Sequence, residues 1–274
     1  MDKRSLVLYL SGLAAAGAVV GLAASCSDQP RIKCTAGHGP FAVVYTPKSG
    51  MDPCGMPGEQ IGVEAYNYPL TGENGTNIDP NRGSLGMEPF AIADEIGERG
   101  PDPNAAHKPH SVGDWATPEP TAEEFCAVTN PNDIEQDLPA IPAVPPSDAG
   151  PGSPFHPAIS VKYHWTNVRF YNTPASPGTQ LIADLSFSFQ EGPGADGGAP
   201  PAPCTAEYKA VGLWPAVDCS ADPPGMGTDV SKCSAEPDLS KNRPLGSGIS
   251  PDLATKCDET LHLCVLVKDP PSFK

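Results

Sequence analysis

Histidines are the first residues in this chain that could hold a metal ion. His107 and His110 lie three positions apart, and on a helix this spacing puts two side chains on one face. Pro109 lies between them, and Pro101 and Pro103 lie just before, so no helix is expected there. The other histidines are scattered singly: His38, His156, His164 and His262. We therefore predict no histidine metal site, and no metal or other cofactor.

Oxygen ligands with a calcium-like spacing occur upstream. Asn77, Asp79, Asn81 and Glu88 occupy positions 1, 3, 5 and 12 of a loop of the EF-hand kind. Position 6 of such a loop must be glycine for its sharp turn, and here it is Arg82. Flanking helices are also not evident. We therefore predict a polar surface loop, with an irregular calcium site as the alternative.

A glycine-rich segment at Gly192–Gly197 matches the G-x-G-x-x-G pattern and directly follows a predicted strand. In a dinucleotide-binding fold, a helix must follow whose N-terminus binds the pyrophosphate. Pro200, Pro201 and Pro203 prevent a helix at that place. We therefore predict a loop, and no cofactor-binding residues.

Serine nucleophiles of the elbow type require the spacing G-x-S-x-G between a strand and a helix. Neither Gly83–Gly86 nor Gly246–Gly248 has that spacing. We predict that the chain has no catalytic residues and is not an enzyme. The alternative is a hydrolase whose histidine, carboxylate and serine come together only in the fold.

Tryptophans could instead line a surface that binds a glycan. The three are Trp115, Trp165 and Trp214. A carbohydrate-binding module would need two coplanar exposed tryptophans, and it stays an alternative. Tryptophan is highly buried on average, so we predict that these side chains belong to the core.

The elements that position these residues are mainly strands. Leu181–Gln190 alternates apolar and polar residues. Val161–Phe170 also alternates, but its apolar residues change from odd to even positions near Thr166 and Asn167. An extra residue there predicts a β-bulge. Asn172–Thr179 predicts a longer loop that joins the two strands into an antiparallel hairpin. Three side chains should be buried together in this hairpin: Trp165, Leu185 and Phe187.

Further short strands are predicted at Phe41–Tyr45, Gln60–Tyr68, Thr205–Leu213 and His262–Lys268. Only Thr121–Val128 looks helical, because Thr121 and Glu124 have the spacing of a capping box. Many short strands with almost no helix predict a mainly β fold, a disulfide-stapled antiparallel β-sandwich-like ectodomain with long Pro/Gly-rich loops.

The Pro and Gly residues also suggest how the chain is organised. Residues 130–157 contain eight prolines and little periodicity, and we predict a linker or long loop. It separates an N-terminal β-rich segment, residues 34–129, from a C-terminal one, residues 158–274, and the two segments could form one domain. Residues 192–203 and 220–250 are further turn-rich stretches.

The first 25 residues have the pattern of an export signal. Lys3 and Arg4 precede the apolar stretch Leu6–Ala24, which ends in small residues, and this order is typical of a secretory signal peptide. A retained transmembrane helix is the alternative, since about 20 apolar residues span a bilayer. Three glycines dilute the stretch and no basic cluster follows it, so we favour the signal peptide.

The residues Leu22-Ala23-Ala24-Ser25-Cys26 resemble the lipobox of bacterial lipoproteins, with Leu22 one place earlier than is usual. The resemblance implies that residues 1–25 are removed and that Cys26 becomes a lipidated N-terminus, followed by a tether at residues 26–33. The residue after Cys26 is Ser27 and not Asp, and in this the chain resembles lipoproteins that are released to the outer membrane. The alternative is ordinary cleavage, with Cys26 joining a disulfide.

Cysteine parity supports this interpretation. The chain has nine cysteines, and an odd number in an exported protein indicates an unpaired thiol unless one is modified. The other eight are Cys34, Cys54, Cys126, Cys204, Cys219, Cys233, Cys257 and Cys264. We predict four disulfides, as an oxidising envelope allows. We favour the pairs Cys34–Cys54, Cys219–Cys233, Cys257–Cys264 and Cys126–Cys204.

Charge bounds the partners. Without residues 1–25, which contain Asp2, Lys3 and Arg4, the chain has 32 acidic and 15 basic side chains, a net charge of −17 over 249 residues. Such a surface repels polyanions, so we predict no nucleic-acid partner.

Taken together, these features predict a lipid-anchored envelope protein with a binding or structural role. It would be held to the outer membrane through Cys26, with an envelope protein or a glycan as partner. An envelope hydrolase and a carbohydrate-binding module are the alternatives.

Overall fold

The computed structural model describes residues 32–70, 77–146, 152–223, 225, 227–241 and 243–274. The chain divides into two units, Met1–Ile32 and Lys33–Lys274. The predicted signal peptide, its transmembrane alternative and Cys26 lie outside the described residues, as does most of the tether. All elements described below belong to Lys33–Lys274.

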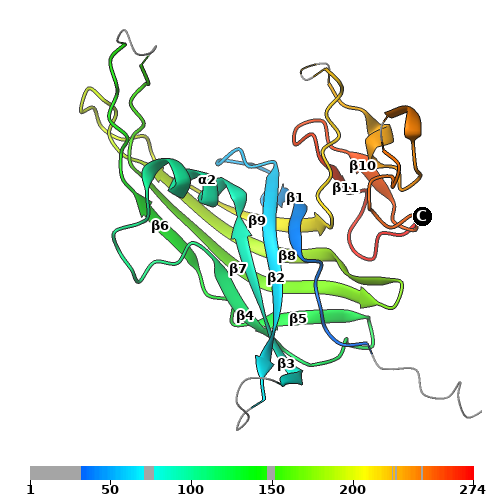
Figure 1. The fold of residues 1–274 in the computed structure, drawn as a ribbon. Helices are drawn as coiled ribbons and strands as arrows, with labels where there is room; N and C mark the ends of the chain where they lie inside the picture. Colours follow the sequence, from blue (N-terminus) through cyan, green and yellow to red (C-terminus); the bar gives the residue numbers. More distant parts are fainter. Residues whose placement is uncertain (1–31, 71–76, 147–151, 224, 226, 242) are drawn as a thin grey trace, which may run out of the picture. The chain divides into compact units, whose positions relative to one another are not determined.

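Nine antiparallel strands form one large curved sheet (Figure 1). In chain order they are β1 (Gly39–Pro47), β2 (Gly58–Pro69), β3 (Ile78–Pro89), β4 (Ser111–Trp115), β5 (Phe125–Thr129), β6 (Ile134–Leu138), β7 (Ile159–Thr173), β8 (Ser176–Glu191) and β9 (Cys204–Leu213). Their order in the sheet is β5-β4-β3-β2-β1-β9-β8-β7-β6. This confirms the predicted mainly β, antiparallel fold.

The sheet closes on itself through a second pairing of β7. One edge of β7 pairs with β8, and the other edge pairs with β6 near Tyr163 and with β5 near Phe170. Strands β1 to β5 and β7 to β9 therefore form a continuous circuit around a shared interior. Phe41 on β1 contacts Phe170 on β7 edge to face, with ring centroids 5.7 Å apart, although these strands are not neighbours in the sheet. The interior is thus packed with side chains from opposite parts of the sheet.

The hairpin of β7 and β8 is confirmed. Trp165 lies opposite Leu185, and Tyr163 lies opposite Phe187, so the apolar faces of both strands are buried together. The register shifts between Thr166 and Arg169, where the β-bulge was predicted. The joining loop is shorter than predicted, because β7 continues to Thr173 and β8 begins at Ser176.

The predicted helix at Thr121–Val128 is wrong. Residues 125–129 form β5, which pairs with β4 and β7. The amide of Glu124 donates to the carbonyl of Thr121 at 2.9 Å, and Glu124 has a φ of 65°. Thr121 and Glu124 therefore form a turn that leads into the strand. A sheet partner distant in sequence outweighs a weak local helix signal here.

Several regular elements were not predicted, among them β3, β4, β6 and α2. Helix α2 (Phe90–Arg99) follows β3, buries Ile92 and ends at Gly100, whose amide donates to the carbonyl of Ile96. Residues 130–157, predicted as a linker, contain β6 and two isolated bridges, Ile141 with His156 and Val144 with Ser153. This stretch is therefore partly an extension of the sheet.

The C-terminal residues build a second, smaller core. They contain η1 (Val230–Cys233), η2 (Leu239–Lys241), β10 (Thr255–Cys257) and β11 (Cys264–Leu266). The strand predicted at His262–Lys268 is shortened to β11, and residues 220–250 are turn-rich, as predicted. No helix in the described part of the chain combines the length and the apolarity of a membrane span.

All eight cysteines of the described residues form disulfides, but all four predicted pairs are wrong. The observed pairs are Cys34–Cys126, Cys54–Cys204, Cys219–Cys257 and Cys233–Cys264. Three of the predictions, Cys34–Cys54, Cys219–Cys233 and Cys257–Cys264, assumed that cysteines near in sequence pair, and Cys126–Cys204 was the pair that remained. The fold instead brings together segments as far apart as 150 residues, as at Cys54–Cys204.

Candidate functional site

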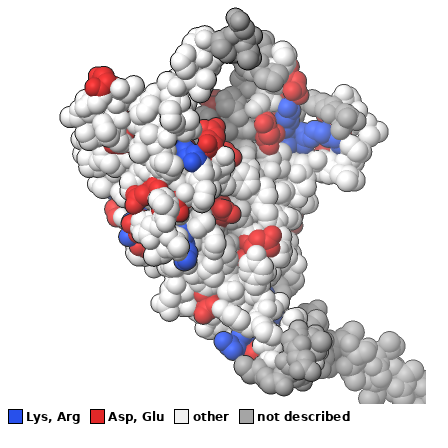
Figure 2. All heavy atoms as spheres, turned by 60° about the vertical axis from the view of Figure 1, so that its left-hand side comes forward, with Lys and Arg blue, Asp and Glu red and all other residues white. Residues whose placement is uncertain are grey.

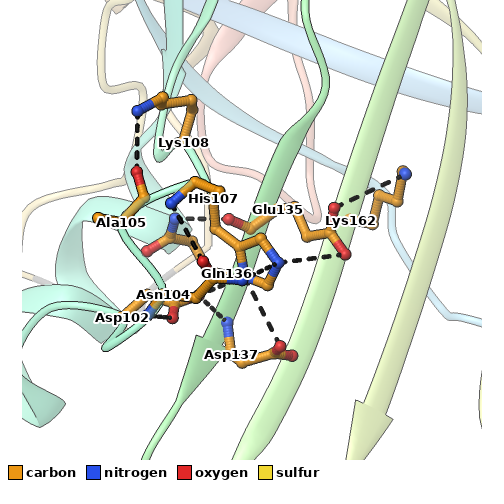
Figure 3. A network of polar contacts seen from close by, with 10 residues as sticks. Asp102, Asn104, Ala105, His107, Lys108, Glu135, Gln136, Asp137 and Lys162 are labelled. Atoms are coloured by element: carbon orange, nitrogen blue, oxygen red, sulfur yellow. Dashed lines mark hydrogen bonds and ion pairs between the residues drawn. The ribbon is translucent and has the colours of Figure 1, made fainter.

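A network of polar side chains surrounds His107, in the segment between α2 and β4 (Figure 3). Asp102 and His107 come from this segment, whereas Glu135 and Asp137 come from β6. Nδ1 of His107 lies 2.8 Å from Oδ2 of Asp102. The Asp102 side chain is 3% exposed and that of His107 is 16% exposed, so this contact is largely shielded from water.

Backbone amides hold the Asp102 carboxylate in place. Its Oδ1 accepts a hydrogen bond from the amide of Asn104 at 2.7 Å, and its Oδ2 accepts one from the amide of Asp137 at 2.5 Å. Burial raises the pKa of Asp102, but these amides and His107 outweigh it and lower the pKa below the usual value. Asp102 is therefore an ionised, fixed acceptor beneath the imidazole.

The imidazole of His107 has further polar neighbours. Its Nδ1 lies 3.6 Å from Oδ2 of Asp137, and its Nε2 lies 3.7 Å from Oε1 of Glu135 and 2.9 Å from the Asn104 side-chain amide. The hydrogen bond to Asp102 raises the pKa of His107, and the charges of the three carboxylates add to this. One atom from each of Asp102, His107 and Asp137 lies within 4.8 Å of the other two. Imidazole nitrogen and carboxylate oxygen are ligands of divalent transition metals.

A second histidine lies on the same sheet with different partners. Nδ1 of His164 is 2.6 Å from Oδ1 of Asp133, while Nζ of Lys162 is 2.7 Å from Oδ2 of that aspartate. Lys162 also lies 3.8 Å from Glu135. The ammonium group therefore neutralises Asp133, and His164 shares this carboxylate with Lys162.

On the face in Figure 2, acidic side chains form separate patches on a mostly uncharged surface.

Sequence reasoning singled out His107 but missed its partners. His107 and His110 do not share a helix, as predicted, and His110 is not part of the network. The one sequence signal that could have linked Asp102 to His107 is that both lie in the same proline-rich segment. Asp137 and Glu135 fall in residues predicted as a linker, so nothing in the sequence joined them to His107.

The residues with calcium-like spacing do not surround a common point. The prediction of a surface loop is wrong, because Asp79, Asn81 and Glu88 lie along β3. Asp79 and Glu88 are nine residues apart, which is about 30 Å in an extended strand. Asp79 instead accepts a hydrogen bond from the amide of Asn81 at 2.9 Å. This segment therefore has no geometry of the EF-hand kind.

A buried carboxyl group lies inside the sheet, at Glu59 on β2. Its Oε1 accepts hydrogen bonds from the hydroxyl groups of Tyr45 at 2.9 Å and Tyr163 at 3.1 Å, and its buried Oε2 has no hydrogen-bond partner. Burial raises the pKa of Glu59 to about 7 and outweighs the lowering effect of the two tyrosine hydrogen bonds. Tyr163 and Ala91 also line a cavity of about 430 Å³ beside α2.

The tryptophans contribute to packing. Trp165 is 1% exposed, and Trp115 and Trp214 are partly buried against the same core. The indole nitrogen of Trp214 donates to the carbonyl of His38 at 2.8 Å. This is the core role predicted for them.

The glycine-rich segment Gly192–Gly197 is a loop without a helix, as predicted.

Comparison with known proteins identifies the family of the chain. The family model MlpA matches residues 39–215, which contain all nine strands of the large sheet and α2. A protein of Myxococcus xanthus described as "Putative lipoprotein MlpA" is 28% identical over 261 residues, covering 90% of each chain. No solved structure matches. The chain therefore belongs to the MlpA family.

Proposed function

We propose that this protein is a lipid-anchored protein of the bacterial cell envelope, with a non-catalytic binding or structural role. The observation that carries the proposal is the lipobox-like sequence that ends at Cys26. A signal peptide at residues 1–25 would deliver the chain to the envelope, and the lipid on Cys26 would hold it there. Several acyl chains on one cysteine anchor a protein far more firmly than a single chain does.

Cysteine pairing supports the same proposal. The eight cysteines of the described residues form four disulfides among themselves, so none of them is available to Cys26. An exported chain with one cysteine left over would otherwise carry a reactive thiol. Lipidation consumes that thiol. The relative's description as a lipoprotein is in keeping with this.

Ser27 favours the outer membrane as the destination, because an Asp at that place is the usual signal for retention at the inner membrane. The membrane would be reached through the lipid on Cys26. An envelope protein or a glycan would be the partner of the ectodomain. The excess of 32 acidic over 15 basic side chains in residues 26–274 argues against nucleic acid.

The surroundings of His107 favour a non-catalytic role. Its described partners are carboxylates and the amide of Asn104, and no serine hydroxyl group is among them. A hydrolase of the serine type needs a nucleophile within hydrogen-bond reach of its histidine. For this reason we prefer a binding or structural protein to an envelope hydrolase.

Metabolic labelling with a fatty-acid analogue tests the anchor. We expect the wild type to be labelled and to fractionate with membranes, and the Cys26→Ser variant to lose the label. Ser27→Ala is the matched control, which should keep the label because it leaves the modified residue in place. A label that persists in Cys26→Ser, or a wild type without label, would refute the proposed anchor.

A further inference from the structure

We infer that Asp102, His107 and Asp137 form a binding site for a first-row divalent transition metal ion of the Zn²⁺ type. The inference does not depend on the lipid anchor, since it concerns the ectodomain alone. Two of the ligands come from the segment before β4 and the third from β6, and Figure 3 shows the His107 imidazole next to the side chains of Asp102 and Asp137. The ion would therefore link this segment to the edge of the sheet.

The distances suit a small ion. Ligand atoms at about 2.0–2.2 Å from Zn²⁺ in tetrahedral geometry lie about 3.4 Å from one another. Nδ1 of His107 lies 2.8 Å from Oδ2 of Asp102 and 3.6 Å from Oδ2 of Asp137. The ligand oxygens of Asp102 and Asp137 lie within 4.8 Å of each other, so side-chain shifts on the order of 1 Å would bring these three atoms around one ion. The Asp137 side chain is 54% exposed, so water could complete the coordination.

Carboxylates outnumber basic side chains around His107. In the part of the chain that the structure describes, His107 is the only basic side chain that pairs with Asp102 or Asp137. A neutral imidazole, which is the form that binds a metal, leaves two carboxylates next to each other with no other counter-ion. A dication supplies that charge. The imidazole favours Zn²⁺ and its neighbours in the first row over Ca²⁺ and Mg²⁺, which prefer oxygen ligands.

The supporting contacts are of the kind found around metal ligands. The amides of Asn104 and Asp137 fix the Asp102 carboxylate. Nε2 of His107 lies 2.9 Å from the side-chain amide nitrogen of Asn104 and 3.7 Å from Oε1 of Glu135, so the Asn104 amide would have to move away for Glu135 to accept the Nε2 proton when Nδ1 binds the ion. Metal-bound histidines commonly donate their other ring N–H to such a carboxylate. Glu135 would therefore orient the imidazole.

His164 on β7 has partners that disfavour a metal ion. It pairs with Asp133 at 2.6 Å, but Lys162 occupies the other oxygen of that carboxylate at 2.7 Å. An ammonium group at this place repels a metal ion. Asp133 and His164 therefore provide a control pair of the same residue types without the predicted affinity.

Titration calorimetry with ZnCl2 tests the inference, using the untagged, detergent-solubilised mature protein after EDTA treatment and dialysis. All eight cysteines of the described residues are in disulfides, so thiolates among them do not compete for the ion. We expect one Zn²⁺ per chain, with affinity reduced at least about 10-fold in both His107→Asn and Asp137→Asn. His164→Asn should bind like the wild type.

Asp137→Asn keeps the test informative if His107→Asn fails to fold, because the Asp137 side chain is half exposed. Circular dichroism establishes that each variant is folded before titration. Wild-type protein that shows no saturable binding of Zn²⁺ would overturn the inference. Binding that Asp137→Asn leaves unchanged would also overturn it.

Discussion

Nδ1 of His107 and Oδ2 of Asp102 lie 2.8 Å apart within the segment between α2 and β4, and the same Asp102 oxygen connects this segment to β6 at the edge of the sheet. Asp102 makes the connection because it also accepts a hydrogen bond from the amide of Asp137 on that strand. Without a metal ion, the pair is a pH-dependent contact between a buried carboxylate and an imidazolium.

The first prediction concerns the pH dependence of this pair. The pKa of His107 is raised in the folded protein, so its contribution to stability is full below 6.5 and is lost as pH rises through the folded value. The pKa of Asp102 is lowered, so its contribution is full above 3.8 and is lost as pH falls through the folded value. In EDTA, the difference in free energy of unfolding between the wild type and His107→Asn should therefore be largest between pH 3.8 and pH 6.5.

Urea unfolding of both proteins at several pH values measures this difference. His164→Asn is the comparison variant, because its histidine lies at the surface with a carboxylate that Lys162 also neutralises. A difference for His107→Asn that stays constant from pH 5 to pH 9 would show that folding does not raise the pKa of His107.

A second prediction concerns Glu59, whose pKa rises to about 7 in the fold from an ordinary 4.5. A carboxyl group with a raised pKa makes the folded state less stable as pH increases from 4.5 to about 7, with no further loss above that. At 1.36 kcal/mol per pKa unit the loss is up to about 3 kcal/mol. Glu59→Gln should remove this loss and be more stable than the wild type at pH 8.

Thermal unfolding at pH 5 and pH 8 tests this effect. Glu98→Gln, at an exposed position of α2, should leave the pH dependence unchanged. If Glu59→Gln shows the same loss of stability between the two pH values as the wild type, the buried carboxyl group is not its source.

The third prediction tests the packing of the β7–β8 hairpin. Phe187 is 6% exposed, and its ring lies 4.9 Å from that of Tyr163 in an edge-to-face contact. Phe187→Ala should cost about 3–5 kcal/mol, because it removes a large core side chain. Ser186→Ala and Ser188→Ala, on the opposite face of β8, should change the free energy of unfolding by less than about 0.5 kcal/mol. Equal effects of all three would contradict the assigned register.

A fourth prediction concerns the disulfides. Peptide mapping under non-reducing conditions should recover the linked pairs Cys34–Cys126, Cys54–Cys204, Cys219–Cys257 and Cys233–Cys264. The double variant Cys34→Ser/Cys126→Ser should lose about 2–5 kcal/mol of stability, because this bridge closes a loop of 92 residues. Recovery of a linked Cys34–Cys54 peptide would contradict the fold around β1 and β5.

The hairpin could be predicted from sequence because its signal is local. The alternation in Leu181–Gln190 specifies which side chains face the core, and the change of parity near Thr166 locates the bulge. The helix predicted at Thr121–Val128 failed for the opposite reason, since β5 depends on β7, about 45 residues later. Local spacing does not contain that information.

The disulfides and the His107 site show the same limit. Cys257 and Cys264 lie opposite each other in β10 and β11, so their predicted proximity is correct, yet each bonds to a cysteine outside the hairpin. Asp137 lies 30 residues after His107 and reaches it only because β6 pairs with β7 at the sheet edge. Both outcomes depend on tertiary contacts between distant segments.

The intact mass of the mature protein extracted from membranes tests the central claim most directly. The lipid-anchor proposal predicts a chain of residues 26–274 whose mass includes acyl chains on Cys26 and four disulfides. Cys26→Ser should yield no species of this mass. A mature chain that begins at another residue, or one that begins at Cys26 without added lipid, would contradict the account.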